Sequence, residues 1–180
     1  KKGADWKHLL YMAMKHSLNG VMFTGIKKLS KELQPQDIEL MKWYGYANIC
    51  AQRNQKLCTQ CVQLTELLAK DGYSSVIMKG QSNAIYYPHP EMRSPRDIDI
   101  WVEGDRKEVI KYLMKKADVR HIQFHHANYD ILPGVEIEVH FRPTLLYNYW
   151  DNERLQAIFL EEQGNSLEFS VKSLENEKKH

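Results

Sequence analysis

The sequence lacks a long run of apolar residues, and this absence limits the class of protein. Nowhere in the 180 residues does an apolar stretch approach the roughly 18 positions that a membrane-spanning helix requires. The N-terminal residues also lack the apolar segment of a secretory signal peptide. We therefore expect a cytoplasmic protein with no membrane partner.

Cysteine is scarce, and Cys50, Cys58 and Cys61 make an odd number. In a chain without a secretion signal this argues against a disulfide framework. Cys58 and Cys61 have the spacing of half a zinc site, but no second pair follows and both lie in a helical pattern. We expect free thiols buried on one face of a helix.

An excess of one charge is also missing. The 25 Lys and Arg against 23 Asp and Glu leave a net charge of +2, and no basic stripe dominates. A nucleic-acid-binding surface normally requires such a stripe, so there is no strong nucleic-acid signature. The chain has no internal repeat, and with 43% hydrophobic residues it can bury a core.

The N-terminal part of the chain has the apolar spacing of helices. Asp5 is a candidate N-cap for a helix over residues 5–18, and a second helix is expected over residues 20–33. Pro35 begins a further stretch, one long helix or two, that ends near Gly72. We identify no chemistry in this region.

Beyond Gly72 the pattern changes to that of strands and short helices. Residues 75–78 form a short apolar strand, residues 81–87 can form a short helix, and three prolines make the next segment a loop. Residues 97–102 put Asp97, Asp99 and Trp101 on one side and apolar residues on the other, an alternation that indicates a strand.

The remaining elements follow the same reasoning. Asp105 is expected to cap a helix that runs to about Ala117, with Val109, Ile110, Leu113 and Met114 facing inward. Residues 119–141 predict two strands joined by a turn at Pro133-Gly134, and residues 151–163 predict a last helix.

Two pairs of acids interrupt apolar strands. Asp97 and Asp99 lie on one face of their strand, and Glu136 and Glu138 lie on one face of theirs. Like charges this close repel one another, and burial strengthens the repulsion. A divalent cation would relieve it, because Mg²⁺ (or Mn²⁺) prefers carboxylate oxygens and substrate phosphates, and two such ions can clamp a phosphoryl transfer. The alternative is a wet sheet edge where the acids point into solvent.

The residues before these acids suit an anion. Lys79-Gly80-Gln81-Ser82 follows a strand and opens a helix, where free N–H groups and the lysine charge attract phosphate. Taken singly, Gly80 is a tight turn and Lys79 a surface lysine. Together with the acids they place an anion site beside a metal site, which is the arrangement that a nucleoside triphosphate requires.

These segments resemble the bacterial uncharacterised nucleotidyltransferase family of the polymerase-beta-like superfamily. The resemblance extends from about residue 5 to about residue 145 and is most specific in its middle. The matching features are the Lys79-Gly80 pair, Ala84 with Tyr87 and Pro88, Arg93 four residues before Asp97 and Asp99, and Glu138 followed by His140.

The resemblance implies an α+β fold, in which a small mixed β-sheet forms a nucleotidyltransferase core with flanking helices. It places a helical N-terminal region at residues 1–71, the core at 72–145 and a partial helical C-terminal segment at 146–180. Members of the family are generally longer at the C-terminus, so we expect this chain to lack a helical part that holds the base or acceptor.

The resemblance also implies a reaction and its residues. Asp97, Asp99 and Glu138 would be the catalytic and metal-binding carboxylates, with Glu136 competing for the third place. Asp99 or Glu138 would deprotonate an acceptor hydroxyl, a nucleoside monophosphate would pass from an NTP to it, and pyrophosphate would leave. The acceptor would be a protein, an RNA or a small molecule.

A second set of residues would bind the nucleotide. His140 would orient a carboxylate, contact phosphate or simply pack, and Arg93 would bind phosphate or pair with an aspartate. The nucleotide-binding set comprises Lys79, Gly80, Gln81, Ser82, Arg93 and His140. Two features depart from the superfamily: its glycine-serine turn is Gly80-Gln81-Ser82 here, and Gly80 and Asp97 are 17 positions apart, which is longer than usual.

Two other functions share parts of this pattern. A glycosyltransferase can hold a nucleotide-sugar through Mn²⁺ on an Asp-x-Asp, but it does not require Lys79-Gly80 before it. A catalytically inactive nucleotide-binding domain, or a toxin–antitoxin-like interaction domain, would have lost its acids, whereas all three are present here.

Overall fold

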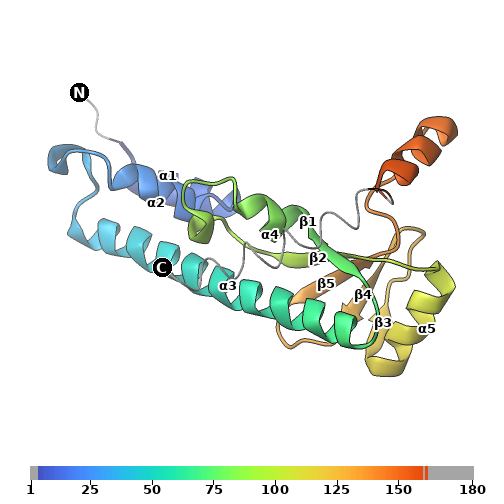
Figure 1. Ribbon diagram of the computed structural model, residues 1–180. Coiled ribbons are helices and arrows are strands. Elements are labelled where there is room, and N and C mark those ends of the chain that lie inside the picture. Colours follow the sequence, from blue (N-terminus) through green and yellow to red (C-terminus); the bar gives the residue numbers. More distant parts are fainter. Residues whose placement is uncertain (1–3, 160, 162–180) are drawn as a thin grey trace. The chain divides into compact units, whose positions relative to one another are not determined.

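The computed structural model describes residues 4–159 and 161. It has the predicted α+β fold with a five-stranded mixed sheet (Figure 1). The chain divides into a helical unit, Lys1–Leu57 with Ala84–Pro95, and a sheet unit, Cys58–Asn83 with Arg96–His180. The long helix α3 contributes to both units, and the domain boundaries expected at residues 71 and 145 stay predictions.

The helical unit is built from α1 (Trp6–Lys15), α2 (Asn19–Ile26), the 3-10 turns η1 (Lys31–Leu33) and η2 (Pro90–Met92), and the first part of α3 (Asp37–Lys70). The predicted N-cap of α1 is confirmed, because the Asp5 carboxylate accepts a hydrogen bond from the His8 backbone N–H at 3.0 Å. The stretch after Pro35 is a single helix rather than two.

The second predicted helix, over residues 20–33, is wrong in its length. Helix α2 ends at Ile26, and η1 forms separately after a break. The end of α2 contains Thr24 and Gly25, which are weak helix formers. The Thr24 hydroxyl also donates to the Val21 carbonyl at 2.6 Å, an interaction that competes with regular helix hydrogen bonding.

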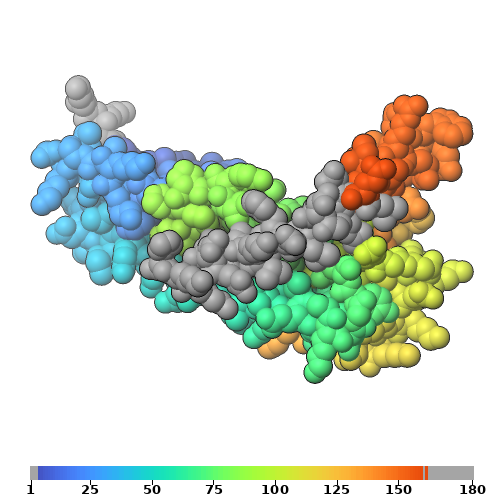
Figure 2. Space-filling view, in the orientation of Figure 1, coloured from blue at the N-terminus to red at the C-terminus, as the bar shows by residue number. Residues whose placement is uncertain are grey.

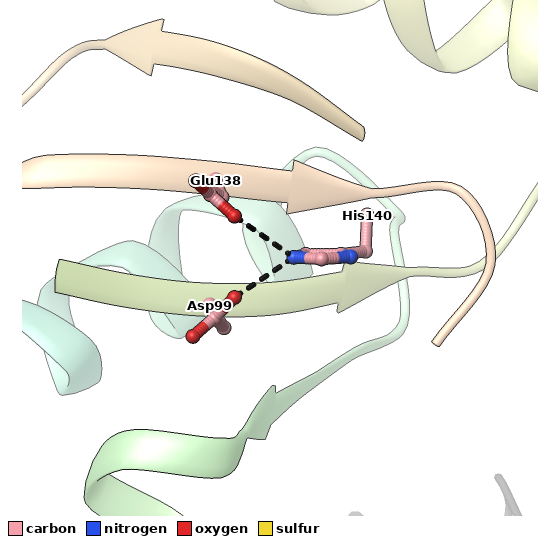
Figure 3. Close-up of side chains that lie close together, drawn as sticks. All are labelled: Asp99, Glu138 and His140. Atoms are coloured by element: carbon pink, nitrogen blue, oxygen red, sulfur yellow. Dashed lines mark hydrogen bonds and ion pairs between the residues drawn. The ribbon is translucent and has the colours of Figure 1, made fainter. Parts of the chain in front are cut away.

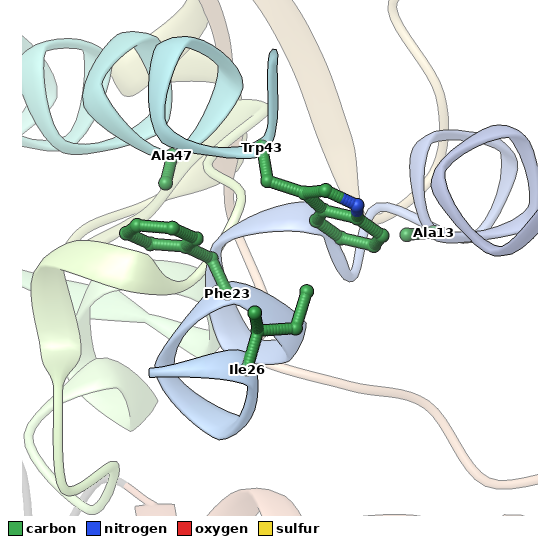
Figure 4. Close-up of a cluster of buried hydrophobic side chains, with 5 residues drawn as sticks. All are labelled: Ala13, Phe23, Ile26, Trp43 and Ala47. Atoms are coloured by element: carbon green, nitrogen blue, oxygen red, sulfur yellow. The ribbon is translucent and has the colours of Figure 1, made fainter. Parts of the chain in front are cut away.

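A buried apolar cluster holds the helical unit together (Figure 4). Its members come from α1, α2 and α3 and are Ala13, Phe23, Ile26, Trp43 and Ala47. Met92 packs against this cluster from the proline-containing segment. The Asn54 side-chain amide anchors the same segment by donating to the carbonyls of Glu91, at 2.9 Å, and Arg93.

The sheet unit contains β1 (Ser75–Met78), β2 (Asp97–Val102), β3 (Asp118–Arg120), β4 (His126–Asp130) and β5 (Glu136–His140), in the order β1-β2-β5-β4-β3. The β2–β5 pair is parallel and the remaining pairs are antiparallel. A parallel pair requires a long connection, which α5 (Arg106–Lys116), β3 and β4 supply between β2 and β5.

The first strand predicted within residues 119–130 is divided in the structure. His121 has a left-handed backbone (φ 48°), so the chain turns there and β3 pairs with β4. The predicted turn at Pro133-Gly134 is confirmed: β4 and β5 pair antiparallel, and Gly134 has a φ of 73° that glycine adopts without strain.

Helix α5 follows its prediction except at one residue. The Asp105 carboxylate caps it by accepting from the backbone N–H of Lys107 and Glu108. Val109 and Leu113 are fully buried, but Met114, which was expected to face inward, is 57% exposed. One helical position rotates a side chain by about 100°, which carries Met114 beyond the edge of the buried stripe.

One face of the sheet forms the apolar core of this unit. Its members alternate along the three central strands and are fully or almost fully buried: Ile98, Ile100, Val102, Ala127, Tyr129, Ile137 and Val139. Because side chains alternate between faces, the residues between them, including the acids, lie on the opposite face.

The cysteines of α3 are free thiols, as expected. Burial, with a smaller contribution from nearby Cys58, raises the pKa of Cys61 to about 12. Cys58 is half-buried and accepts a hydrogen bond from the Gln81 side-chain amide at 3.0 Å. Cys58 therefore contacts the helix that follows β1, and the raised pKa of buried Cys61 disfavours its reactive thiolate form.

Residues 149–159 form a helix, so the predicted last helix begins slightly earlier than residue 151. Residues 160, 162 and 163 of that prediction lie outside the described residues. Tyr147, Tyr149 and Trp150 at its start are exposed, and Figure 2 shows this segment in orange at the surface. Within the described residues, no helix combines the length and the apolar character needed to cross a bilayer.

A glycine in α2 tests the packing of the helical unit. A Cβ atom added at Gly20 would overlap the Met92 carbonyl oxygen, whereas one added at Gly25 would meet nothing within 4 Å. We expect Gly20→Ala to lower the free energy of unfolding by about 1–3 kcal/mol in urea denaturation. Gly25→Ala in the same helix is the control and should be neutral or stabilising; equal effects of the two would contradict the described packing.

A buried tyrosine predicts a loss of stability at alkaline pH. Burial, aided by the negative charge of Asp71, raises the pKa of Tyr129 to about 12, against about 10 in an unfolded chain. The unfolded state therefore loses a proton first, and the free energy of unfolding falls as the pH rises from about 10 to 12. We expect Tyr129→Phe to remove the contribution of one titrating proton from this pH dependence of the free energy of unfolding, measured by urea denaturation at several pH values. Tyr147→Phe, at an exposed position, should leave it unchanged.

Candidate active site

The register of the parallel pair brings the acids of two strands together. Asp97 of β2 lies opposite Glu136 of β5, and Asp99 lies opposite Glu138. Residues paired across neighbouring strands point to the same face of a sheet, so all four acids share one face. This face is opposite to the apolar core.

Two of these acids and one histidine form a close group (Figure 3). One ligand atom each from Asp99, Glu138 and His140 lie within 4.8 Å of one another, the only such group of His, Cys, Asp and Glu found among the described residues. His140 Nε2 lies 2.9 Å from Asp99 Oδ1 and 3.5 Å from Glu138 Oε2. Asp99 and His140 are buried, whereas the Glu138 side chain is 26% exposed.

Lys79 supplies a positive charge to this group. Its Nζ lies 2.6 Å from Asp99 Oδ1, and it is placed there by the turn from β1 into α4 (Lys79–Ala84). The left-handed residue of that turn is Lys79 itself, with a φ of 49°. A non-glycine residue adopts this conformation at an energetic cost, so the fold strains the backbone at the residue that reaches Asp99.

The other residues of the predicted phosphate turn lie within α4. Gly80 is helical, so the turn does not use its conformational freedom as the sequence suggested. The Ser82 hydroxyl donates to the Lys79 carbonyl at 3.2 Å, and the Gln81 amide donates to Cys58. The expected contacts of Gly80, Gln81 and Ser82 with a nucleotide stay predictions.

The charge of Asp99 is stabilised by its neighbours. Burial pushes the pKa of Asp99 upward, but hydrogen bonds from His140 and Lys79 outweigh burial and leave this pKa below its ordinary value. A carboxylate that stays ionised while buried requires nearby positive charge or hydrogen-bond donors. In this structure Lys79 and His140 provide both.

Asp97 and Glu136 form the neighbouring cross-strand pair on the same face of the sheet. Asp97 is half-buried and does not belong to the close group of Asp99, Glu138 and His140. Glu136 is exposed and accepts a hydrogen bond from the Asn128 side-chain amide at 2.8 Å. The geometry therefore places Glu138, rather than Glu136, beside Asp99.

Arg93 lies in the segment of the helical unit that Asn54 anchors. Its main-chain carbonyl accepts a hydrogen bond from the Asn54 amide. The role of its guanidinium, toward phosphate or toward an aspartate, stays a prediction.

Sequence reasoning missed the polar residues of β4. Asn128 lies opposite Glu138, and His126 lies opposite His140. The rings of His125 and His126 lie 5.9 and 5.4 Å from that of His140. Burial, together with the charges of the two neighbouring histidines, lowers the pKa of His125. The polar residues at every second position of His126–Asp130 are the pattern that could have revealed this polar face.

The donor set fits a divalent cation. Carboxylate oxygens and an imidazole nitrogen from paired strands are common ligands of such ions, and the group is open on the Glu138 side. The pairing of Lys79 with Asp99 shows that positive charge is electrostatically favourable beside this carboxylate. Asp99, Glu138 and His140 could therefore hold a metal ion.

The salt bridge of Lys79 can be tested without any ligand. We expect Lys79→Gln to raise the pKa of Asp99, because a donor to its carboxylate is lost, and to lower the free energy of unfolding at neutral pH by about 1 kcal/mol. The stabilisation from Asp99 is complete above the unfolded pKa of about 3.9 and disappears as the pH falls through the lower folded value.

Carboxyl-carbon NMR titration measures the pKa of Asp99, and urea denaturation measures the stability. Lys115→Gln, an exposed lysine of α5, is the charge-matched control and should change neither quantity. An unchanged Asp99 pKa in Lys79→Gln would show that the salt bridge does not form in solution.

Comparison with known proteins agrees with the features described above. A family model described as an uncharacterised nucleotidyltransferase matches residues 2–178. Searches of curated proteins and of solved structures give no significant match. The match covers nearly the whole chain and confirms the resemblance found in the sequence.

Proposed function

The chain belongs to the uncharacterised nucleotidyltransferase family, and on this premise we propose that it transfers a nucleoside monophosphate from an NTP to an acceptor hydroxyl, with Mg²⁺ or Mn²⁺ as cofactor. The observation that carries the proposal is the convergence of Asp99, Glu138 and His140 beside Lys79. Under this proposal the convergence would bring metal-binding and phosphate-binding groups to one point of the sheet.

The carboxylates divide their roles according to their surroundings. Asp99 and Glu138 would hold the metal together with Asp97, and His140, which could also be a ligand, would fix the orientation of Asp99 through its 2.9 Å contact. A bound divalent ion would neutralise the triphosphate and polarise its phosphorus toward attack. Asp97 would reach such an ion from the adjacent row of the same face.

Glu138 is the better candidate for the proton acceptor. Asp99 is buried and already receives hydrogen bonds from Lys79 and His140, whereas Glu138 is more exposed and lies 3.5 Å from His140. The acceptor oxygen would bond to the α-phosphorus as its proton passes to the Glu138 carboxylate. The bond from the α-phosphorus to the bridging oxygen would break, and pyrophosphate would leave.

Lys79 would assist the leaving group. In the described structure its ammonium neutralises Asp99, and with Asp99 serving as a metal ligand Lys79 would be able to contact phosphate oxygens. Gly80, Gln81 and Ser82 would flank this position. The triphosphate would therefore lie on the β1 side of the carboxylates.

The test compares four isosteric variants. We expect Mg²⁺ with one of the four common triphosphates to raise the melting temperature. At a hundredfold excess of ligand over Kd, the stabilisation of the folded state is about 2.7 kcal/mol. Asp97→Asn, Asp99→Asn and Glu138→Gln should abolish this shift and slow pyrophosphate release by about 100-fold or more. Glu136→Gln is the matched control and should retain most of both.

The outcomes separate the competing functions. A loss in Glu136→Gln but not in Glu138→Gln would move the third carboxylate to Glu136. Stabilisation by UDP-sugars but by no triphosphate would favour a glycosyltransferase. Tight triphosphate binding without pyrophosphate release in any acceptor screen would indicate an inactive nucleotide-binding domain.

A further inference from the structure

A cavity of about 750 Å³ opens in the sheet unit at the ends of β3, β4 and β5. One wall is the Pro133-Gly134 turn, and the polar side chains that line the cavity are Arg96, Arg120, His121, Asn128, Asp130 and Glu136. Its volume lies within the roughly 300–1,000 Å³ that is typical of small-molecule sites. The functional residues described above do not account for this cavity.

The sheet register places the cavity beside the carboxylates. Asn128, in its lining, lies directly opposite Glu138, and Glu136 is the next residue on the same face of β5. Lys79 follows β1, at the other side of β2 in the strand order β1-β2-β5-β4-β3. In the strand order, Asp99 and Glu138 therefore lie between β1, which Lys79 follows, and the strands β4 and β3, which carry Asn128, Asp130 and Arg120 of the cavity lining.

The hydrogen-bonding capacity of the cavity favours an anionic ligand. Its two acids already have partners: Asp130 is paired with Arg120, and Glu136 accepts from Asn128. Arg120 is paired with Asp130, and its Nε lies 3.8 Å from Asp118 Oδ2, but with five N–H donors and a 58% exposed side chain it still has donors available. Arg96 adds a second guanidinium, and the arginine fork matches carboxylate and phosphate groups.

We propose that this cavity binds the acceptor, and that the acceptor is a small molecule carrying a hydroxyl and a carboxylate or phosphate group. The inference rests on the proposed function and adds the substrate class to it. Arg96 and Arg120 hold the anionic group, so that the hydroxyl reaches the α-phosphorus from the Glu138 side. Pyrophosphate leaves on the opposite side, toward Lys79, as an in-line displacement requires.

The first experiment measures binding by calorimetry without nucleotide or metal. The probes are glycerol 3-phosphate and glycerate, with glycerol as the uncharged comparison. We expect saturable binding of at least one anion and none of glycerol, weakened about tenfold by Arg120→Gln and by Arg96→Gln. Lys115→Gln should have no effect, and the probe that binds more tightly distinguishes phosphate from carboxylate.

Two further measurements keep this result interpretable. The Arg120→Gln protein should retain the melting-temperature shift with Mg²⁺ and triphosphate, which shows that it is folded and that the nucleotide side is intact. Absence of saturable binding of both anions at millimolar concentration overturns the proposal. Binding that is abolished in Lys79→Gln but retained in both arginine variants also overturns the proposal. Neither result affects the proposed nucleotidyl transfer.

The second experiment identifies the acceptor class during turnover. The protein is incubated with α-labelled triphosphates, Mg²⁺ and whole cell extract, and the products are separated by acid precipitation. We expect an acid-soluble labelled product, formed about tenfold more slowly by Arg120→Gln. Label in precipitable protein or RNA overturns the small acceptor but supports transfer. No labelled product and no pyrophosphate in any fraction overturns the proposed function, and the acceptor role with it.

Discussion

The stability of the sheet unit depends on neighbouring groups that compensate the negative charge of one buried carboxylate. Asp99 is 6% exposed and lies directly opposite Glu138 on the neighbouring parallel strand. An uncompensated charge in such a place costs several kcal/mol, so the surroundings must supply opposite charge or donors. Lys79 and His140 do so from two different elements, at 2.6 and 2.9 Å, and their hydrogen bonds keep the pKa of Asp99 low despite its burial.

This requirement explains why the chain follows its particular path. Lys79 can reach Asp99 only because β1 pairs with β2 and ends in a left-handed turn at the lysine itself. His140 can reach it only because β5 returns parallel to β2 after a long excursion through α5, β3 and β4. The apolar residues on the opposite face of the same strands hold this register, because a shift by one residue would reverse every side chain.

The same register gives the polar face two sides with different chemistry. The β1 side presents a lysine at the entry to a helix, and the β4 side presents arginines and an asparagine around a cavity. The carboxylates between them suit a metal-dependent transfer from one side to the other. The helical unit has its own apolar core, which includes Trp43, and a proline-containing segment that Asn54 anchors.

The sequence by itself determined the strands at residues 75–78 and 97–102, the caps at Asp5 and Asp105, and the acids on strand faces, because these follow from local periodicity and capping, while its family resemblance implied the α+β class. Periodicity could not choose between Glu136 and Glu138, since both share one face of their strand, and only the acid-x-His pattern of the resembled family favoured Glu138. The strand order and register are what set Glu138 beside Asp99 and His140. The tertiary structure also decided that Lys79 carries the turn and that Asn128 and Arg120 join the same face, because such contacts link residues far apart in the chain.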